Sequence, residues 1–169
     1  MHVIGIVGWK NSGKTTLVVE LVRLLTARGL KVATIKHAHH DFDIDHPGKD
    51  SHRHREAGAT DVIVASGARW AQVHELRGSP EPELGDLLPR ISPGTDIVLV
   101  EGFKRDPHDK IEVVPHDFDG RLLTLDDPHV IALASDAAAL PAVAVPVLAR
   151  SDAAAVAGFI LRHTGLGSV

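Results

Sequence analysis

Gly8-Trp-Lys-Asn-Ser-Gly-Lys-Thr15 follows directly on the apolar run His2-Val-Ile-Gly-Ile-Val7, and these residues decide the fold. The octapeptide matches the pattern G-x-x-x-x-G-K-[ST] at every fixed position. That pattern indicates a P-loop only where a strand precedes it and a helix follows it. Residues 2–7 have the β-branched, apolar composition of a strand that is buried on both faces. Leucines at positions 17, 21, 24 and 25 form one stripe of a helix after the loop.

Each fixed position of the P-loop has a chemical reason. Gly8 and Gly13 let the backbone wrap around a phosphate at φ values that side chains oppose. The backbone N–H groups of residues 11–16 converge on the phosphates, at the positive end of the following helix. Lys14 is expected to reach the β- and γ-phosphates, and the Thr15 hydroxyl to take one position around Mg²⁺. The residues of this loop that we predict to bind nucleotide are Gly8, Asn11, Ser12, Gly13, Lys14, Thr15 and Thr16.

Strand-like and helical stretches alternate along the rest of the chain, which is typical of an α/β protein. Strands are predicted at residues 30–36, 61–65, 96–100, 130–134 and 143–147, and helices at residues 50–57, 84–91 and from 151 onward. Two weaker, alternating stretches, residues 69–76 and 110–114, are predicted as edge or hairpin strands outside the main sheet. We predict one domain over residues 1–169, built on a single doubly wound, mostly parallel sheet of P-loop NTPase type with additional hairpin strands.

The composition argues against several classes of protein. The net charge of −4 speaks against broad binding to nucleic acid or to an anionic membrane. Cysteine is absent, which excludes disulfides and thiolate metal sites. No apolar run approaches the roughly 20 residues that span a bilayer, and the N-terminus lacks the features of a signal peptide. A cytoplasmic enzyme or binding protein is therefore expected.

A P-loop NTPase also needs an acid at the end of a neighbouring strand, where it holds Mg²⁺ or its water. The candidate stretch is Asp96-Ile-Val-Leu-Val-Glu101. Glu101 lies at the carboxyl end of this strand, where α/β sheets bind their ligands, whereas Asp96 begins the strand at the opposite edge. We therefore predict that Thr15 and Glu101 hold the metal.

The base-recognition residue is less obvious, because the usual guanine reader, Asn/Thr-Lys-x-Asp, is absent. Ala134-Ser-Asp136 follows the predicted strand of residues 130–134, at the corresponding place. The Asp136 carboxylate can accept hydrogen bonds from N1–H and N2–H₂ of guanine, which adenine does not offer. It is equally suited to cap the turn of residues 137–140, and both interpretations stay open.

Residues 37–51 are rich in His and Asp and have neither helical nor strand periodicity. A polar connection of this length inside a compact domain usually carries function. We interpret it as a switch or substrate loop, with Asp41 as a candidate catalytic residue that orients an attacking water. A Zn²⁺ or Ni²⁺ site and a plain solvated loop are the alternatives, because this spacing does not fix a tetrahedron by itself. The candidate contact residues are Lys36, His37, His39, Asp45, Lys49 and Asp50.

The sequence resembles the MobB family, the molybdopterin-guanine dinucleotide biosynthesis adapter proteins. The resemblance is carried by G-W-K-N-S-G-K-T-T-L at residues 8–17 and T-I-K-H-A-H-H-D-F-D-I-D-H-P-G-K-D-S at residues 34–51. R-E-A-G-A at residues 55–59 and L-V-E-G-F-K at residues 99–104 add to it. The last third matches only as a pattern of strands with A-S-D at residues 134–136.

The resemblance implies a GTP-binding protein with at most slow Mg²⁺-dependent GTPase activity, usually a homodimer. It further implies a protein that assists a guanylyltransferase in joining GMP to molybdopterin and that meets molybdopterin-carrying proteins. Carried over residue by residue, it assigns phosphate binding to residues 11–16 and Mg²⁺ to Glu101, and residues 37–51 would line the cleft for nucleotide or pterin. Residues 69–76 and 110–114 are the candidate dimer-contact strands.

Two other functional classes stay open. One is a P-loop kinase of a small metabolite, with Arg105 and Arg121 as candidate lid residues. The other is a metallochaperone GTPase that would carry Ni²⁺ or Zn²⁺ on its histidines.

Overall fold

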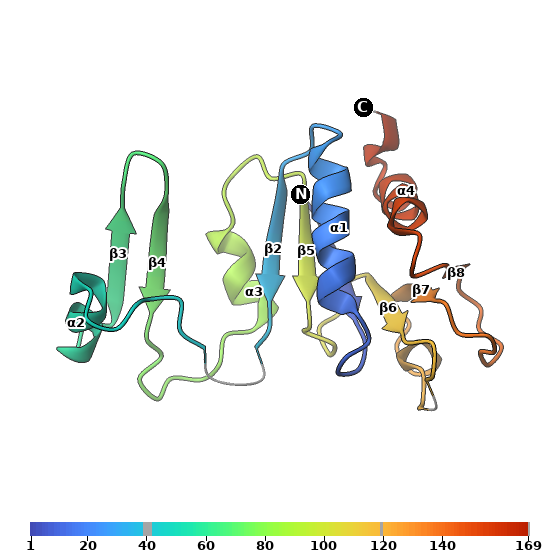
Figure 1. Ribbon diagram of the computed structural model, residues 1–169, viewed down its shortest axis with the longest axis horizontal. Helices are drawn as coiled ribbons and strands as arrows, with labels where there is room; N and C mark the ends of the chain where they lie inside the picture. Colours follow the sequence, from blue (N-terminus) through green and yellow to red (C-terminus); the bar gives the residue numbers. More distant parts are fainter. Residues whose placement is uncertain (39–41, 119, 169) are drawn as a thin grey trace. The chain divides into compact units, whose positions relative to one another are not determined.

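Six parallel strands form the main sheet of the computed structural model, which describes residues 1–38, 42–118 and 120–168 (Figure 1). Every neighbouring pair of strands runs parallel. The α/β class and the mostly parallel sheet predicted from the sequence are thereby confirmed. In spatial order the strands are β2 (Val32–Lys36), β5 (Ile97–Glu101), β1 (His2–Val7), β6 (Lys110–Val114), β7 (Val130–Ser135) and β8 (Val147–Leu148).

Two long helices, α1 (Lys14–Thr26) and α4 (Ala153–Thr164), cover one face of this sheet and contact each other (Figure 1). Their apolar faces join the inward side chains of β1, β5, β6 and β7 in the main core. The buried residues of α1 are Leu17, Val18, Leu21 and Leu25, close to the leucine stripe predicted from the sequence. A smaller cluster on the other face contains Val114, Leu122, Val130 and Leu133.

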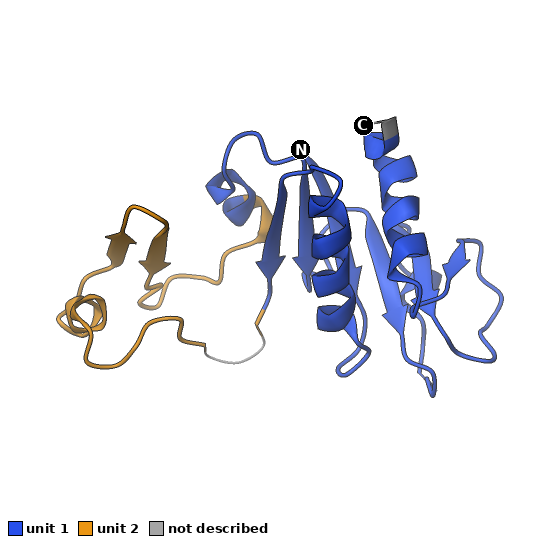
Figure 2. Cartoon of the chain, turned by 45° about the horizontal axis from the view of Figure 1, so that its top comes forward, with its two compact units in different colours: residues 1–37, 86–169 blue, residues 38–85 orange. Residues whose placement is uncertain are grey.

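The chain divides into two compact units, one of residues 1–37 and 86–169 and one of residues 38–85 (Figure 2). The second unit contains the short helix α2 (Asp50–Glu56) and a two-stranded antiparallel sheet of β3 (Asp61–Ala65) and β4 (Trp70–His74). The hairpin strand predicted at residues 69–76 is therefore present, with β3 as its partner.

The prediction that residues 110–114 lie outside the main sheet is wrong. They form β6, which lies between β1 and β7 and is buried along its whole length. Its two charged side chains gave the stretch its alternating appearance, and both are buried with partners. Lys110 Nζ lies 2.9 Å from Asp127 Oδ2, and the Glu112 carboxylate accepts hydrogen bonds from the backbone N–H groups of Leu123 and Thr124 at 2.9 and 3.0 Å.

The remaining differences between prediction and structure concern element boundaries. The predicted helix at residues 84–91 divides into α3 (Leu84–Leu87) and a 3₁₀ turn, η1 (Leu88–Arg90), because Pro89 cannot continue an α-helix. The last helix begins at Ala153, where the carboxylate of Asp152 accepts a hydrogen bond from the Ala155 N–H at 2.8 Å. Two further 3₁₀ turns are η2 (Leu123–Leu125) and η3 (Leu166–Ser168).

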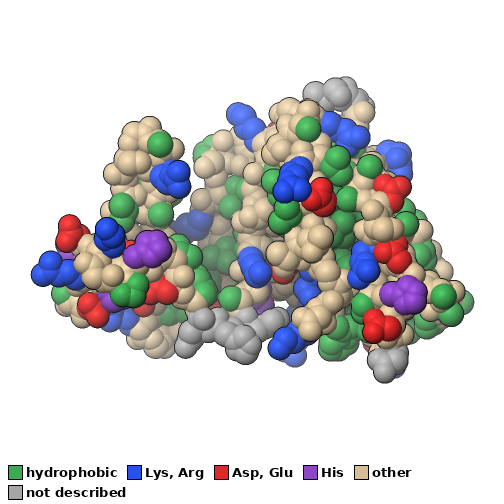
Figure 3. Space-filling model, viewed as in Figure 1, with side chains coloured by type: hydrophobic (Ala, Val, Ile, Leu, Met, Phe, Trp, Pro, Cys, Tyr) green, Lys and Arg blue, Asp and Glu red, His purple; other side chains and the backbone are tan. Residues whose placement is uncertain are grey.

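The surface agrees with the modest net charge. Figure 3 shows basic and acidic side chains interspersed on the face that it presents. Within the described residues, no helix is long and apolar enough to cross a membrane.

Candidate nucleotide-binding site

The P-loop lies at the carboxyl end of β1, the strand at which the winding of the sheet reverses. From β1 the chain passes through α1 to β2 on one side, and from β5 it continues to β6 on the other side of β1 (Figure 1). Ligands of open α/β sheets bind at such a switch point. Residues 8–13 form the loop and α1 begins at Lys14, so the strand and helix that the motif requires are both present.

The backbone of this loop adopts conformations that favour glycine. Gly8 has φ 147° and Gly13 has φ 90°, and the intervening Asn11 is left-handed at φ 62°. A Cβ atom at Gly8 would lie 2.4 Å from the carbonyl oxygen of Val113, so no larger residue fits there without moving β6. A left-handed residue within such a loop can turn the neighbouring backbone N–H groups toward one concave surface, which is the geometry of an anion-binding nest.

Lys14 sits in a cationic environment. Its ammonium donates a hydrogen bond to the carbonyl oxygen of Trp9 at 2.7 Å, so the side chain folds back over the loop. Burial lowers the pKa of Lys14, and the nearby charges of Lys104 and Lys36 lower it further, whereas Glu101 opposes the shift. Three lysines and one carboxylate influence each other here, so a bound anionic ligand would stabilise the charged form of Lys14.

The predicted metal residues lie together. The Thr15 hydroxyl donates a hydrogen bond to Glu101 Oε1 at 2.8 Å, and Lys36 Nζ lies 3.7 Å from the same oxygen. The register explains the meeting, because Glu101 is paired with Ile6 of β1 and with Lys36 of β2. Asp96 lies at the other end of β5, where its carboxylate accepts a hydrogen bond from the Lys31 N–H at 2.7 Å.

The oxygen pair of Thr15 and Glu101 fits Mg²⁺. Neighbouring ligands of an octahedral Mg²⁺ ion lie about 2.9 Å apart, since each Mg–O distance is about 2.0–2.1 Å. The two oxygens are separated by 2.8 Å, and both are of the hard type that Mg²⁺ selects. Mg²⁺ in phosphate sites typically takes one or two protein ligands and completes its shell with water and phosphate oxygens.

We predict that metal dependence runs through Glu101 and not through Asp96. Glu101→Gln removes the carboxylate charge, so the gain in nucleotide affinity that Mg²⁺ provides should fall roughly tenfold or more. Asp96→Asn should leave that gain intact, because Asp96 faces the opposite edge of the sheet. Titrations of nucleotide with and without Mg²⁺ on both variants measure this difference. The reverse pattern would mean that Asp96, at the other end of β5, and not Glu101 is the acid that holds the metal.

Asp136 is linked to the P-loop by Arg150, which was not predicted from the sequence as a site residue. Its Oδ1 accepts hydrogen bonds from the N–H and hydroxyl groups of Ser151, at 3.2 and 3.0 Å, and its Oδ2 lies 3.4 Å from Arg150 Nε. The backbone hydrogen bond from Ser151 lowers the pKa of Asp136. Arg150 Nη1 also donates to the carbonyl oxygen of Ser12 at 3.1 Å, so one guanidinium joins Asp136 to the loop. The signal in the sequence was a basic residue two positions after β8.

The turn-capping alternative for Asp136 does not match the observed bonds. The Ala137 N–H donates to the hydroxyl of Ser135 at 3.1 Å, so Ser135 provides this cap. The Asp136 carboxylate instead connects β7 to the segment that follows β8.

Lys36 and His37, at the end of β2, lie beside Glu101. The His37 N–H donates to the carbonyl oxygen of Glu101 at 2.8 Å, and its ring stacks on Phe103 with centroids 4.8 Å apart. This end of β2 therefore borders the Thr15–Glu101 pair. His39 and Asp41 lie outside the described residues.

In the second unit, one arginine of α2 holds the acidic residues of the His/Asp-rich segment. Arg55 binds Asp43 with both terminal nitrogens, at 2.9 and 3.3 Å, and its Nη1 lies 3.4 Å from Asp45 Oδ2. Its Nε donates to Glu75 Oε1 at 2.7 Å. The hydrogen bonds from Arg55 lower the pKa of Asp43 to about 2. Lys49 and Asp50 are exposed at the start of α2.

These contacts weaken the metal-site interpretation of this segment. The Arg55 guanidinium already neutralises Asp43 and Asp45, which is the role that a metal ion would otherwise take. Among residues 1–38, 42–118 and 120–168, no group of three or more His, Asp or Glu residues is arranged to hold a metal ion.

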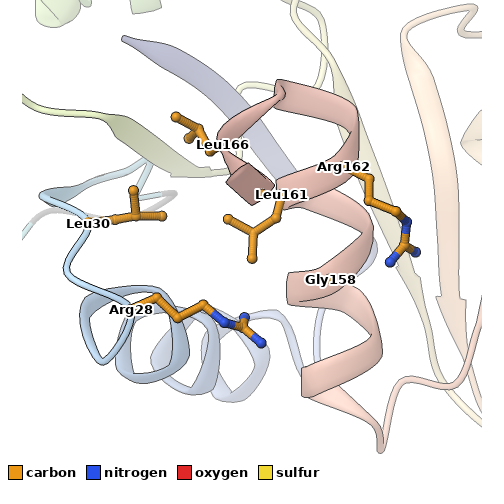
Figure 4. A pocket seen from close by; sticks show the side chains of 7 residues that line it. Arg28, Leu30, Gly158, Leu161, Arg162 and Leu166 are labelled. Atoms are coloured by element: carbon orange, nitrogen blue, oxygen red, sulfur yellow. The ribbon is translucent and has the colours of Figure 1, made fainter. Parts of the chain in front are cut away.

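A cavity of about 240 Å³ lies between the C-terminal ends of α1 and α4, away from the P-loop (Figure 4). Its two arginines, Arg28 and Arg162, lie where basic side chains stabilise the negative ends of helices. Its lining residues are Arg28, Leu30, Gly158, Leu161, Arg162, Leu166 and Gly167.

Comparisons with known proteins agree with this geometry. The family model of molybdopterin guanine dinucleotide synthesis protein B, MobB, matches residues 3–136. The chain is 45% identical over 130 residues to the molybdopterin-guanine dinucleotide biosynthesis adapter protein of Escherichia coli, covering 76% of this chain and 74% of that protein. It is 42% identical over 135 residues to the protein of the same name from Haemophilus influenzae, covering 79% and 74%.

A solved structure extends the similarity to the whole fold. The MobB protein homologue from Bacillus stearothermophilus superimposes with a TM-score of 0.77 at 25% identity, covering 98% of this chain and 99% of that one. The family match includes the P-loop, Glu101 and Asp136, and the structural match reaches the C-terminal helix as well. With most of its length matched by the family model and by relatives above 40% identity, this chain belongs to the MobB family.

Proposed function

We propose that this chain is a cytoplasmic adapter that binds GTP with Mg²⁺ and assists a molybdenum cofactor guanylyltransferase in attaching GMP to molybdopterin. The family supports the pathway, because the relatives are named molybdopterin-guanine dinucleotide biosynthesis adapter proteins. The proposed binding of nucleotide is supported above all by the 2.8 Å contact between Thr15 and Glu101, at the start of the helix that follows the P-loop.

Different residues of the site are proposed to bind the phosphates, the base and the metal. The backbone N–H groups of residues 11–16 and the ammonium of Lys14 hold the phosphates, and Asp136 accepts hydrogen bonds from the guanine edge. Thr15 and Glu101 hold the metal, which when bound neutralises phosphate charge. Hydrolysis is at most slow in this proposal, with Asp41 as the candidate that orients water.

The carboxyl end of β2 and the segment after it are proposed to contact the nucleotide, the pterin cofactor or a molybdopterin-carrying protein. Lys36 and His37 lie beside Glu101, so they border the phosphate end of the site. His39, Asp45, Lys49 and Asp50 are proposed as contacts to nucleotide, to the pterin cofactor or to molybdopterin-carrying proteins.

The two alternative functions find less support in the structure. A kinase lid would need arginines on a mobile helix, but Arg121 is paired with Asp126 and the described part of residues 102–120 contains no helix. A metallochaperone would need free ligands, and Arg55 already binds Asp43 and Asp45.

Reconstitution tests the proposed adapter function. The chain is added to a guanylyltransferase of this pathway with molybdopterin and Mg²⁺–GTP, and the GMP-containing cofactor is quantified over time. We expect the wild-type chain to raise the yield of this product, and Lys14→Ala, which lacks the phosphate contact, to raise it much less. Equal yields with and without the wild-type chain would contradict the adapter proposal.

We also propose a homodimer formed through the hairpin of β3 and β4, and not through β6, which is interior. The hairpin exposes large apolar side chains: Ile63 is 64% exposed and Trp70 is 63% exposed. A two-stranded sheet is marginally stable alone, and open strand edges favour pairing with another chain. Light scattering at micromolar concentration should give twice the 18.0 kDa chain mass, and charge introduced by Ile63→Lys should reduce it. A wild-type mass near that of one chain would count against the dimer.

A further inference from the structure

The turn after β5, Glu101-Gly-Phe-Lys104, is held in an unusual backbone conformation. Gly102 has φ 105°, and Phe103 is one of the few non-glycine residues with positive φ, at 49°. A Cβ at Gly102 would lie 2.7 Å from the Cβ of His37, so glycine is required at this position. The Phe103 ring stacks on His37. Left-handed non-glycine residues persist where surrounding contacts enforce them, and such strain is found at functional sites.

This turn carries Lys104 to the P-loop. Lys104 Nζ lies 4.6 Å from the centroid of the Trp9 ring, and Trp9 is the second residue of the loop. The charge of Lys104 is among the causes that lower the pKa of Lys14, and it also stabilises the charged form of Glu112. The ammonium therefore lies near the Trp9 ring, Lys14 and Glu112.

Among the residues that the structure describes, none uses the hydrogen-bonding capacity of Lys104. Glu112 is the nearby carboxylate, and its two oxygens already accept hydrogen bonds from Leu123 and Thr124. Within the described parts of the chain, no atom accepts a hydrogen bond from Lys104 Nζ, although an ammonium has three donors. A cation held over an aromatic ring and beside another lysine is poised for an anionic ligand.

We propose that Lys104 is a phosphate-binding residue, whose ammonium moves from the Trp9 ring to the β- and γ-phosphate end of the bound nucleotide. This inference rests on the proposed binding of nucleotide at the P-loop. Lys14 is the P-loop residue assigned to those phosphates, and Lys104 lies over the ring of Trp9 in the same loop. Arg150 has a different role, because its Nη1 already donates a hydrogen bond to the Ser12 carbonyl oxygen.

The competing explanation is that Lys104 only neutralises the buried carboxylate of Glu112. The two explanations differ in what a second substitution does. If Lys104 serves Glu112, then Glu112→Gln removes the need for it, and the double variant Lys104→Met/Glu112→Gln should recover the thermal stability and GTP affinity of the wild type. If Lys104 binds phosphate, the loss of GTP affinity should persist in the double variant.

The test measures dissociation constants for GTP and GMP on the wild type, on Lys104→Met and on the double variant. Arg105→Met is the matched control, because Arg105 is the adjacent cation and is exposed, and no described residue is bonded to its side chain. We expect Lys104→Met to weaken GTP roughly tenfold and GMP much less, because a charge-assisted contact to the outer phosphates is lost. Arg105→Met should leave both constants unchanged.

A second measurement needs no change at Lys104. In a Trp70→Phe background Trp9 is the only tryptophan, so its fluorescence should change when inorganic pyrophosphate draws the ammonium off the ring. Unchanged GTP affinity in Lys104→Met, recovery in the double variant, or constant Trp9 emission would each overturn the inference. If Lys14→Ala loses GTP and Lys104→Met does not, only Lys104 is misassigned; a wild type that binds no GTP removes the proposed function as well.

Discussion

Lys14→Ala should lower the affinity of the chain for GTP at least roughly tenfold, because it removes a charge-assisted contact worth about 1.5–3 kcal/mol. In the structure the Lys14 ammonium donates a hydrogen bond to the Trp9 carbonyl oxygen of its own loop. Calorimetric or fluorescence titration of GTP with the variant and the wild type gives the ratio of dissociation constants.

The control for this substitution is Lys31→Ala. Lys31 directly precedes β2, at the edge of the sheet opposite to the P-loop, and its removal changes the net charge of the chain by the same amount. Its GTP affinity should match that of the wild type. A dissociation constant that Lys14→Ala leaves unchanged would mean that these eight residues are not a phosphate site.

Base choice gives the second large effect: GTP should bind roughly tenfold or more tightly than ATP, and Asp136→Asn should erase most of that preference. The Asp136 carboxylate can accept hydrogen bonds from N1–H and N2–H₂ of guanine, and adenine, which lacks these donors, would forgo both bonds. Its Oδ2 carries only the long 3.4 Å contact to Arg150, so this oxygen retains capacity for a ligand.

The same variant provides its own controls. Asparagine presents an N–H donor where the second acceptor was, so it opposes guanine, and XTP, with a carbonyl in place of the 2-amino group, should regain affinity. The Mg²⁺ dependence of binding should stay unchanged, because Thr15 and Glu101 are untouched. Equal affinity of the wild-type chain for GTP and ATP would remove Asp136 from base recognition and renew the case for a kinase.

The sequence predicted the parts of this fold that depend on local pattern. The P-loop and its flanking strand and helix follow from residues 2–26, where composition, periodicity and glycine positions agree. The position of Glu101, rather than Asp96, beside the P-loop also followed from sequence, since the direction of a parallel strand determines which of its ends meets the loop. The short helix at Asp50 and the hairpin strand at β4 have equally local signals.

The features that were missed depend on partners far away in sequence. β6 was misplaced because Lys110 and Glu112 are buried against Asp127 and the amides of η2, which the stretch itself does not reveal. Arg150 reaches Ser12 across 138 positions, and the proximity of Lys104 to Trp9 depends on a left-handed Phe103. Pairings of this kind are fixed by the assembled sheet.

Binding of nucleotide and Mg²⁺ at the P-loop is tested most directly by a titration of the wild-type chain with GTP, first with Mg²⁺ and then with the metal chelated. A P-loop whose Thr15 and Glu101 hold the metal predicts saturable binding of one GTP per chain that weakens substantially when Mg²⁺ is removed. Absence of saturable GTP binding in the presence of Mg²⁺ would contradict the assignment of a nucleotide site to this loop.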